Sequence, residues 1–158
     1  MRKIAATVFL TSLTCLSTPS RLNAQVLGYA VAGPAGANGF VNTRRLTFHA
    51  ASGGEVFLGK YAAVGAEGGF IDRLITVSVN GSIHASGEPA IAPFLTAGYT
   101  RLGVRDGEGG AHAWNVGAGA NAWIGRHAGV RFELRDHVRP DRRGATHYWS
   151  MRAGVVFR

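Results

Sequence analysis

Cysteine and lysine are rare in this sequence. Its one cysteine, Cys15, cannot form an internal disulfide, so the class of small secreted domains held together by several disulfides is excluded. Only Lys3 and Lys60 are lysines, so the basic character of the chain comes almost wholly from arginine. After residue 24, no apolar stretch approaches the roughly 20 residues that a membrane-spanning helix needs. If that part crosses a membrane, it must do so as strands.

Residues 1–24 have the pattern of a secretory signal peptide. A short positive head precedes an apolar run from Ile4 to about Leu16, and Ala24 offers a small residue before a cut. We therefore predict a cleaved leader, 1–24, and a single mature domain, 25–158. Three of the 17 basic residues lie in the leader. The mature chain therefore has 14 basic and nine acidic residues, and its net charge is +5. A lipoprotein signal at Cys15 is disfavoured, because the residues before it lack the small-residue pattern.

Two segments near the end of the chain alternate strictly between apolar and polar residues. In 128–138, Phe132 and Leu134 share one face, and Arg131, Glu133 and Arg135 share the other. The segment 147–158 alternates in the same way. A period of two over ten or more residues indicates a strand with one apolar and one polar face.

Six further strand-like segments, separated by turn sequences, precede these two. A glycine pair, Gly53-Gly54, is expected to form a bulge or bend within the second of them. Residues 56–64 are echoed by residues 122–130 at a constant offset of 66, which predicts two equivalent hairpins of an up-and-down meander. The eight expected strands are 26–33, 46–58, 61–71, 75–84, 92–102, 111–124, 128–138 and 147–158.

The expected connections fall into two sets at opposite ends of such a sheet. The first, third, fifth and seventh meet at what we call the distal end, and the others lie at the terminal end, with both chain termini. Mostly longer distal connections and short terminal turns are typical of bacterial outer-membrane barrels. The expected distal connections are 34–45, 72–74, 103–110 and 139–146, and the terminal ones are 59–60, 86–89 and 125–126.

Four segments carry a family resemblance: Asn80–His84, Pro93–Tyr99, Arg131–Val138 and the ending HYWSMRAGVVFR. With them the chain resembles small bacterial outer-membrane β-barrels of the OmpA/OmpX type. The resemblance implies an all-β fold, an eight-stranded antiparallel up-and-down transmembrane barrel in the outer membrane. It also implies a monomer without a cofactor, in contact with lipid and lipopolysaccharide. Such barrels usually end on an aromatic residue that the insertion machinery reads, whereas here Arg158 follows Phe157.

The polar faces predict a charged lumen. Glu67, Arg131, Glu133, Arg135 and Arg152 are expected to face inward, with Arg152 reaching Glu133 across neighbouring strands. The interior of an eight-stranded barrel is just wide enough for side chains to fill it. Buried charges must also be compensated, so we expect a structural plug of ion pairs. A substrate or proton path is the alternative interpretation.

Arginines gather at the expected distal end. Eight of the 14 mature basic residues fall there, and only Lys60, Arg126 and Arg158 fall at the terminal end. Arginine suits phosphate oxygens, which lipopolysaccharide carries at that depth. Solvated loop charge is the alternative interpretation. The candidate contacts with lipopolysaccharide are Arg44, Arg45, Arg139, Arg142 and Arg143.

Other chemistry finds little support in the sequence. The histidines lack a metal-ligand spacing such as HExxH, and no nucleic-acid recognition motif is present. A lipid A-modifying barrel enzyme would need a serine and a histidine that meet, but His147 and Ser150 are three apart and point to opposite faces. We therefore expect no catalysis. The remaining alternative is a soluble, lipocalin-like barrel for a small apolar ligand, with Phe132 and Trp149 turned inward.

Overall fold

The computed structural model describes residues 25–38, 45–85, 90–104, 110–142 and 144–158. The predicted leader lies outside these residues and stays a prediction. No helix in the described part of the chain is long and apolar enough to cross a membrane. The eight strands are β1 (Val26–Asn38), β2 (Arg45–Phe57), β3 (Ala62–Ile71), β4 (Leu74–His84), β5 (Ile91–Val104), β6 (Gly110–Trp123), β7 (Ala128–Asp141) and β8 (Gly144–Phe157).

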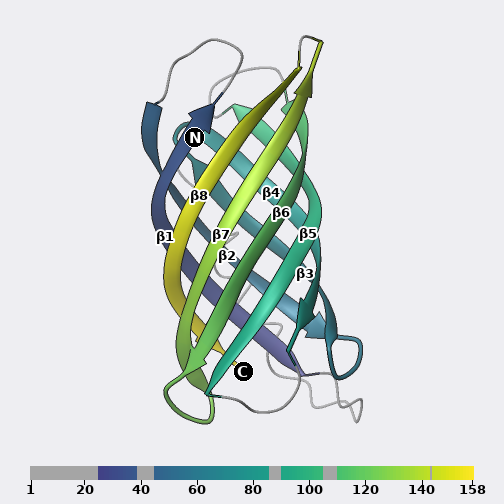
Figure 1. Cartoon of the computed structure of the whole chain (residues 1–158), viewed down its shortest axis with the longest axis vertical. Coiled ribbons are helices and arrows are strands. Elements are labelled where there is room, and N and C mark those ends of the chain that lie inside the picture. The colour runs from purple at the N-terminus through teal and green to yellow at the C-terminus, as the bar shows by residue number, and fades with distance from the viewer. Residues whose placement is uncertain (1–24, 39–44, 86–89, 105–109, 143) are drawn as a thin grey trace, which may run out of the picture.

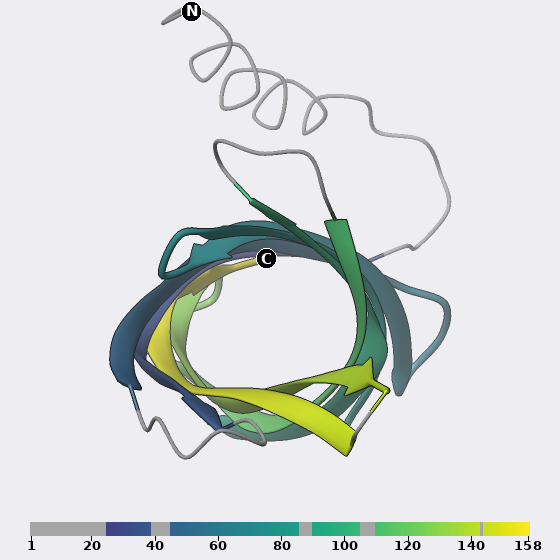
Figure 2. The same ribbon diagram turned by 90° about the horizontal axis from the view of Figure 1, so that it is seen from above.

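The strands form one closed antiparallel barrel. Each strand pairs with the next along the chain, and β8 pairs with β1, so the sheet has no free edge. Figure 1 shows the strands tilted around the barrel axis, and Figure 2 shows the ring that they close. The predicted eight-stranded up-and-down barrel is therefore confirmed.

Burial in this barrel is the reverse of that in a soluble protein. Among the described residues, 24 large hydrophobic side chains are exposed, whereas 18 polar or charged residues are buried. On β7, Phe132 and Leu134 are 54% and 60% exposed, while Arg131, directly before Phe132, is fully buried. The polar residues of most strands thus turn inward, as in barrels whose outer surface meets lipid, while β1 turns Leu27, Tyr29 and Val31 inward.

The sequence echo corresponds to two equivalent hairpins at the terminal end. The Leu58 N–H donates to the Ala62 carbonyl at 2.9 Å, and the Ile124 N–H donates to the Ala128 carbonyl at 3.1 Å. The two donors are 66 residues apart in the sequence, and so are the two acceptors. The prediction of matching hairpins after β2 and β6 is confirmed.

Of the bulge or bend expected at Gly53-Gly54, the bulge is wrong. The pairing of β1 with β2 runs through it without an extra residue, with Gly28 opposite Gly54 and Tyr29 opposite Gly53. A Cβ atom at Gly53 would lie 2.8 Å from the Tyr29 hydroxyl. The glycine therefore makes room for the tyrosine ring inside the barrel.

The predicted long distal connections are also wrong in two places. Strand β1 continues through Pro34 to Asn38, and β7 and β8 extend to Asp141 and Gly144. Pro34 lacks an N–H, and the pairing of β1 with β8 skips Gly33 and Pro34, then resumes in the same register. The strand bounds leave six, two, five and two residues between strands at the distal end, against four, six and four at the terminal end. The two ends therefore do not differ in loop length as expected.

Candidate functional site

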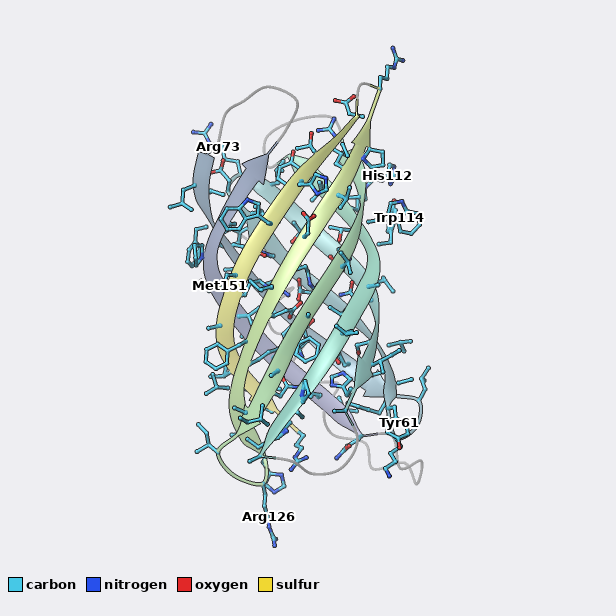
Figure 3. All side chains as sticks on the ribbon, in the orientation of Figure 1. Tyr61, Arg73, His112, Trp114, Arg126 and Met151 are labelled. Atoms are coloured by element: carbon cyan, nitrogen blue, oxygen red, sulfur yellow. The ribbon has the colours of Figure 1, made fainter. Side chains whose placement is uncertain are left out.

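Strand alternation places all five predicted lumen residues inside the barrel. Arg131, Glu133 and Arg135 follow one another on the inner face of β7, Arg152 lies on β8 and Glu67 on β3. None of the five is more than 3% exposed. Figure 3 shows the contrast with the labelled Trp114, which projects away from the barrel.

Glu133 is the centre of one half of the lumen network. Its Oε1 lies 2.5 Å from Nη2 of Arg135 and 3.0 Å from Nη2 of Arg152. Its Oε2 accepts a hydrogen bond from Nε of Arg131 at 3.1 Å. Glu133 and Arg152 are register partners across β7 and β8, so their predicted contact is present.

Glu67 is the centre of the other half and approaches from across the barrel. Arg152 donates to its two oxygens at 2.7 and 3.0 Å, and Arg135 donates to Oε1 at 3.3 Å. The Tyr29 hydroxyl donates to Oε2 at 3.0 Å. Arg135 and Arg152 thus bridge Glu67 and Glu133, and tie β3 to β7 and β8 across the lumen.

A third carboxylate, Glu55, was missed by the sequence analysis. It lies 2.9 Å from Nη2 of Arg131 and 2.7 Å from Nε2 of His84, and it accepts a hydrogen bond from Ser82 at 3.0 Å. The expected bulge at Gly53-Gly54 hid the alternation that turns Glu55 inward. Contacts between β2 and β4, which are not neighbours, also leave no trace in sequence spacing.

The buried charges balance. Three carboxylates, Glu55, Glu67 and Glu133, meet three guanidinium groups, those of Arg131, Arg135 and Arg152, and all six residues are at most 4% exposed. Charges removed from water are stable only when they are paired, and each of the three guanidinium groups lies within ion-pair distance of a carboxylate. Nη1 of Arg131 and Nε of Arg152 are buried without a hydrogen-bond partner.

Arg131 has additional aromatic support. Its guanidinium carbon lies 4.2 Å from the centre of the Tyr29 ring and 3.9 Å from that of Phe94. Both distances fit cation–π contacts, which are stronger in a desolvated site. These contacts hold the guanidinium in place while it bridges Glu55 and Glu133.

A neutral polar layer continues the filling towards the distal end. His49 bonds to Ser150 at 3.0 Å, and Thr100 bonds to His137 at 3.0 Å and to Ser78 at 2.8 Å. The His49 and His137 rings lie edge to face, with centres 5.8 Å apart. Side chains therefore fill the lumen both at the level of the ion pairs and on their distal side.

Ser82, His84 and Glu55 resemble a catalytic triad only in composition. Ser82 and Glu55 both contact Nε2 of His84, at 3.0 and 2.7 Å. A triad needs the acid at one ring nitrogen and the serine at the other, so that the histidine can take the serine proton. Nor does the described part of the chain contain three or more His, Cys, Asp or Glu residues grouped to hold a metal ion.

The terminal end of the lumen opens into a small cavity of about 70 Å³. Phe57 and Trp123 form apolar walls, and Lys60 and Arg158 bring positive charge to it. Asn121 also lines it, and its Oδ1 has no hydrogen-bond partner. The sequence analysis did not single out this cavity, since its walls come from strands that are distant in the sequence.

The candidate lipopolysaccharide contacts are only partly described. Arg44, Arg143 and the side chain of Arg45 lie outside the described part. Arg139 and Arg142 are exposed at the distal end of β7 and in the turn after it. Alternation along β7 puts Arg139 on the same face as Arg135, so it borders the mouth of the lumen. Arg101 shares the outer face of β5 with Tyr99 and is register partner of His112.

The lipocalin-like alternative is wrong for this fold. It required Phe132, Leu134, Trp149 and Met151 to face inward, but all four are at least 40% exposed on the outer face. The inner face of the same strands carries charges instead. An apolar ligand would meet paired carboxylates and guanidinium groups there.

Comparisons with known proteins agree with this fold. No family model and no curated protein matches the sequence. Neisserial surface protein A is similar in structure, with a TM-score of 0.68 and 12% identity over 86% of this chain and 99% of that chain. The N-terminal barrel domain of Pseudomonas aeruginosa OprF (TM-score 0.59, 14% identity) covers 84% of this chain and 98% of its own. A de novo designed transmembrane β-barrel has a TM-score of 0.59 and 15% identity, and the match covers 89% of this chain and 98% of that chain. The fold is therefore that of a small outer-membrane β-barrel.

Proposed function

We propose that this chain is a bacterial outer-membrane protein whose barrel lies in the lipid bilayer. The observation that carries the proposal is the inverted burial: 24 large apolar side chains are exposed around the outside. A contiguous apolar band of this kind is stable in lipid and would promote aggregation in water. Fractionation of cells that express the chain should leave it in the outer-membrane fraction until detergent is added. Release by buffer alone would contradict the proposal.

We also propose that the lumen is closed. An eight-stranded barrel has an interior just wide enough for side chains to fill. Here the six buried charges and the polar layer beyond them fill it. In planar lipid bilayers, the purified protein should therefore give no stable conductance steps. Steady, large steps from the monomer would contradict a filled lumen even if the membrane location is correct.

The role that fits a closed barrel is structural or one of surface contact. A lipid A-modifying enzyme would need its serine, histidine and acid at the lipid-facing surface. The described Ser–His contacts, Ser82 with His84 and Ser150 with His49, lie in the lumen instead. We therefore propose no catalytic activity. Exposure to lipid A should leave its acyl chains intact, and release of a fatty acid would contradict this.

Contact with lipopolysaccharide is the second proposed role. The exposure of Arg139 and Arg142 at the distal end supports it, since a guanidinium group can bind phosphate through two hydrogen bonds. The test compares the stability that lipopolysaccharide adds to the wild type and to a variant with Arg139, Arg142 and Arg143 changed to glutamine. Arg126→Gln, at the opposite end, is the control. Equal stabilisation of all three proteins would contradict the proposed contact.

We further propose that the chain inserts as a monomer and that the insertion machinery reads the end of β8. Phe157 supports this, since it is 52% exposed on the outer face of the last strand. Phe157→Ala should reduce the assembled fraction in cells, whereas the Val26→Ala control, at the same end of β1, should not. Equal assembly of the two variants would contradict a signal at Phe157.

A further inference from the structure

Two histidines, His49 on β2 and His137 on β7, face each other in the lumen beside the ion pairs. Both are fully buried, and their rings lie edge to face with centres 5.8 Å apart. The charged groups that act on this histidine pair are Arg135, Arg152 and Glu67, so two of the three are positive. From β1, β4, β5 and β6 the polar layer receives the neutral side chains of Ala35, Ser78, Thr100 and Asn115.

The contacts of His49 require a neutral ring. Nη1 of Arg152 lies 3.4 Å from its Nε2, and a guanidinium group can only donate. Nε2 therefore keeps its lone pair, while Nδ1 carries the proton and donates to Oγ of Ser150 at 3.0 Å. The Ser150 hydroxyl in turn donates to the Arg135 carbonyl at 3.5 Å. A second proton on His49 would set two donors against each other.

His137 has no acceptor for a second proton either. Its Nδ1 lies 3.0 Å from Oγ1 of Thr100, and its Nε2 is buried without a hydrogen-bond partner in the described part of the chain. The one carboxylate that acts on the pair, Glu67, already accepts hydrogen bonds from Arg135 and Arg152. Protons on the pair would therefore add positive charge that nothing described in the lumen compensates.

A third lumen histidine, His84, has the opposite surroundings. Its Nε2 lies 2.7 Å from Oε2 of Glu55, so a proton on this ring would meet a negative charge. The barrel thus places one buried histidine beside a carboxylate and two beside guanidinium groups. Acid should act on the fold through the histidine pair and not through His84.

We propose that His49 and His137 make the closed barrel sensitive to acid. At neutral pH the uncharged pair ties β2 to β8 and β7 to β5. In an unfolded chain, a histidine has a pKa of about 6.5 and takes up a proton freely below it. In the folded lumen the same proton meets Arg135 and Arg152. The stabilisation by the pair is therefore complete above about pH 6.5 and is lost as the pH falls below it, because the unfolded state then binds more protons.

The first test follows urea unfolding in lipid vesicles from about pH 7.5 to about pH 5, above the ordinary pKa of carboxyl side chains. Below about pH 6.5 the unfolding equilibrium constant of the wild type should rise by up to about a hundredfold per pH unit, or tenfold for each histidine.

The matched variants assign this dependence. The double variant His49→Asn and His137→Asn keeps an amide near each Nδ1 position but cannot be protonated, so it should lose the dependence. His84→Gln is the control and should retain it. An equal pH dependence in the double variant and the wild type would overturn the proposal, as would its loss in His84→Gln.

Nitrogen NMR of the wild type in micelles gives a second answer that needs no variant. The chain has six histidines, and at about pH 5 at least two rings should stay neutral in the folded barrel, one of them with its proton on Nδ1. Six protonated rings in a folded barrel would overturn the proposal. The inference rests on the closed lumen proposed above, whose failure would appear separately, as stable conductance at neutral pH.

Discussion

The two faces of β7 lie one residue apart and are built for different surroundings. On the outer face, Phe132 and Leu134 are more than half exposed and have no specific partner to satisfy. On the inner face, Arg131, Glu133 and Arg135 are at most 2% exposed and each charge meets an opposite one. Outer positions therefore need only to be apolar, whereas inner positions need particular partners.

This difference determines how each face responds to substitution. A lipid-facing residue should tolerate any apolar side chain of similar size, because the solvent around it is uniform. A lumen residue should not tolerate even an isosteric change, because a lost charge leaves a partner buried and unpaired. Three pairs of variants test that contrast, in order of decreasing effect.

The largest effect is expected in the lumen, at Glu67. Glu67→Leu removes the acceptor of Arg135, Arg152 and Tyr29 together and leaves the interior with one excess positive charge. Breaking a buried pair in this way should lower the free energy of unfolding by about 3–5 kcal/mol. Urea unfolding in lipid vesicles measures it, with Glu67→Gln, which keeps the shape and part of the bonding, as the milder comparison. A loss below about 1 kcal/mol in the Leu variant would mean that the network is not needed.

On the outer face, Phe132→Arg should have the next largest effect. A charge facing lipid near the middle of the bilayer costs about 2–4 kcal/mol in barrels of this kind. Phe132→Leu is the control and should be close to neutral in the same unfolding measurement. If the arginine variant is as stable as the leucine variant, Phe132 does not face lipid.

Two tyrosine variants compare the faces with the same chemical change. Tyr29→Phe removes the hydroxyl that donates to Glu67 and keeps the ring over Arg131, so it should cost about 1.5–3 kcal/mol, as for a hydrogen bond to a charged group. Tyr99→Phe removes a hydroxyl that bonds to His112 on the exposed outer face. It should cost less than about 0.5 kcal/mol. Equal losses of unfolding free energy in the two variants would contradict a difference between inner and outer polar contacts.

The sequence was sufficient to predict the barrel and the residues that face inward on β3, β7 and β8. Alternation over 128–138 shows which side of β7 each residue occupies, because the side-chain period of a strand is two. The pairing of Glu133 with Arg152 could be predicted because β7 and β8 are neighbours. The hairpins at 58–62 and 124–128 could be predicted from their shared sequence.

Contacts across the lumen could not be predicted in the same way. Glu55 on β2 contacts His84 on β4 and Arg131 on β7, and neither β4 nor β7 pairs with β2. Their distances depend on strand tilt and register around the whole ring. The expected loops at Pro34 and at 139–146 failed for a local reason. Proline can occupy a strand where it gives up one pairing hydrogen bond, and charged residues can extend a hairpin beyond the barrel.

The most direct test of the account uses the three tryptophans as reporters of lipid. Trp114 and Trp149 are exposed on the outer face, whereas Trp123 packs against the buried cluster at the terminal end and stacks on Arg158. In vesicles of brominated lipid, Trp123→Phe, which keeps the two outer tryptophans, should show strong quenching of fluorescence. A double variant with Trp114→Phe and Trp149→Phe, which keeps only Trp123, should show little. Equal quenching of the two proteins, or stronger quenching of Trp123, would contradict an apolar outer face in contact with lipid.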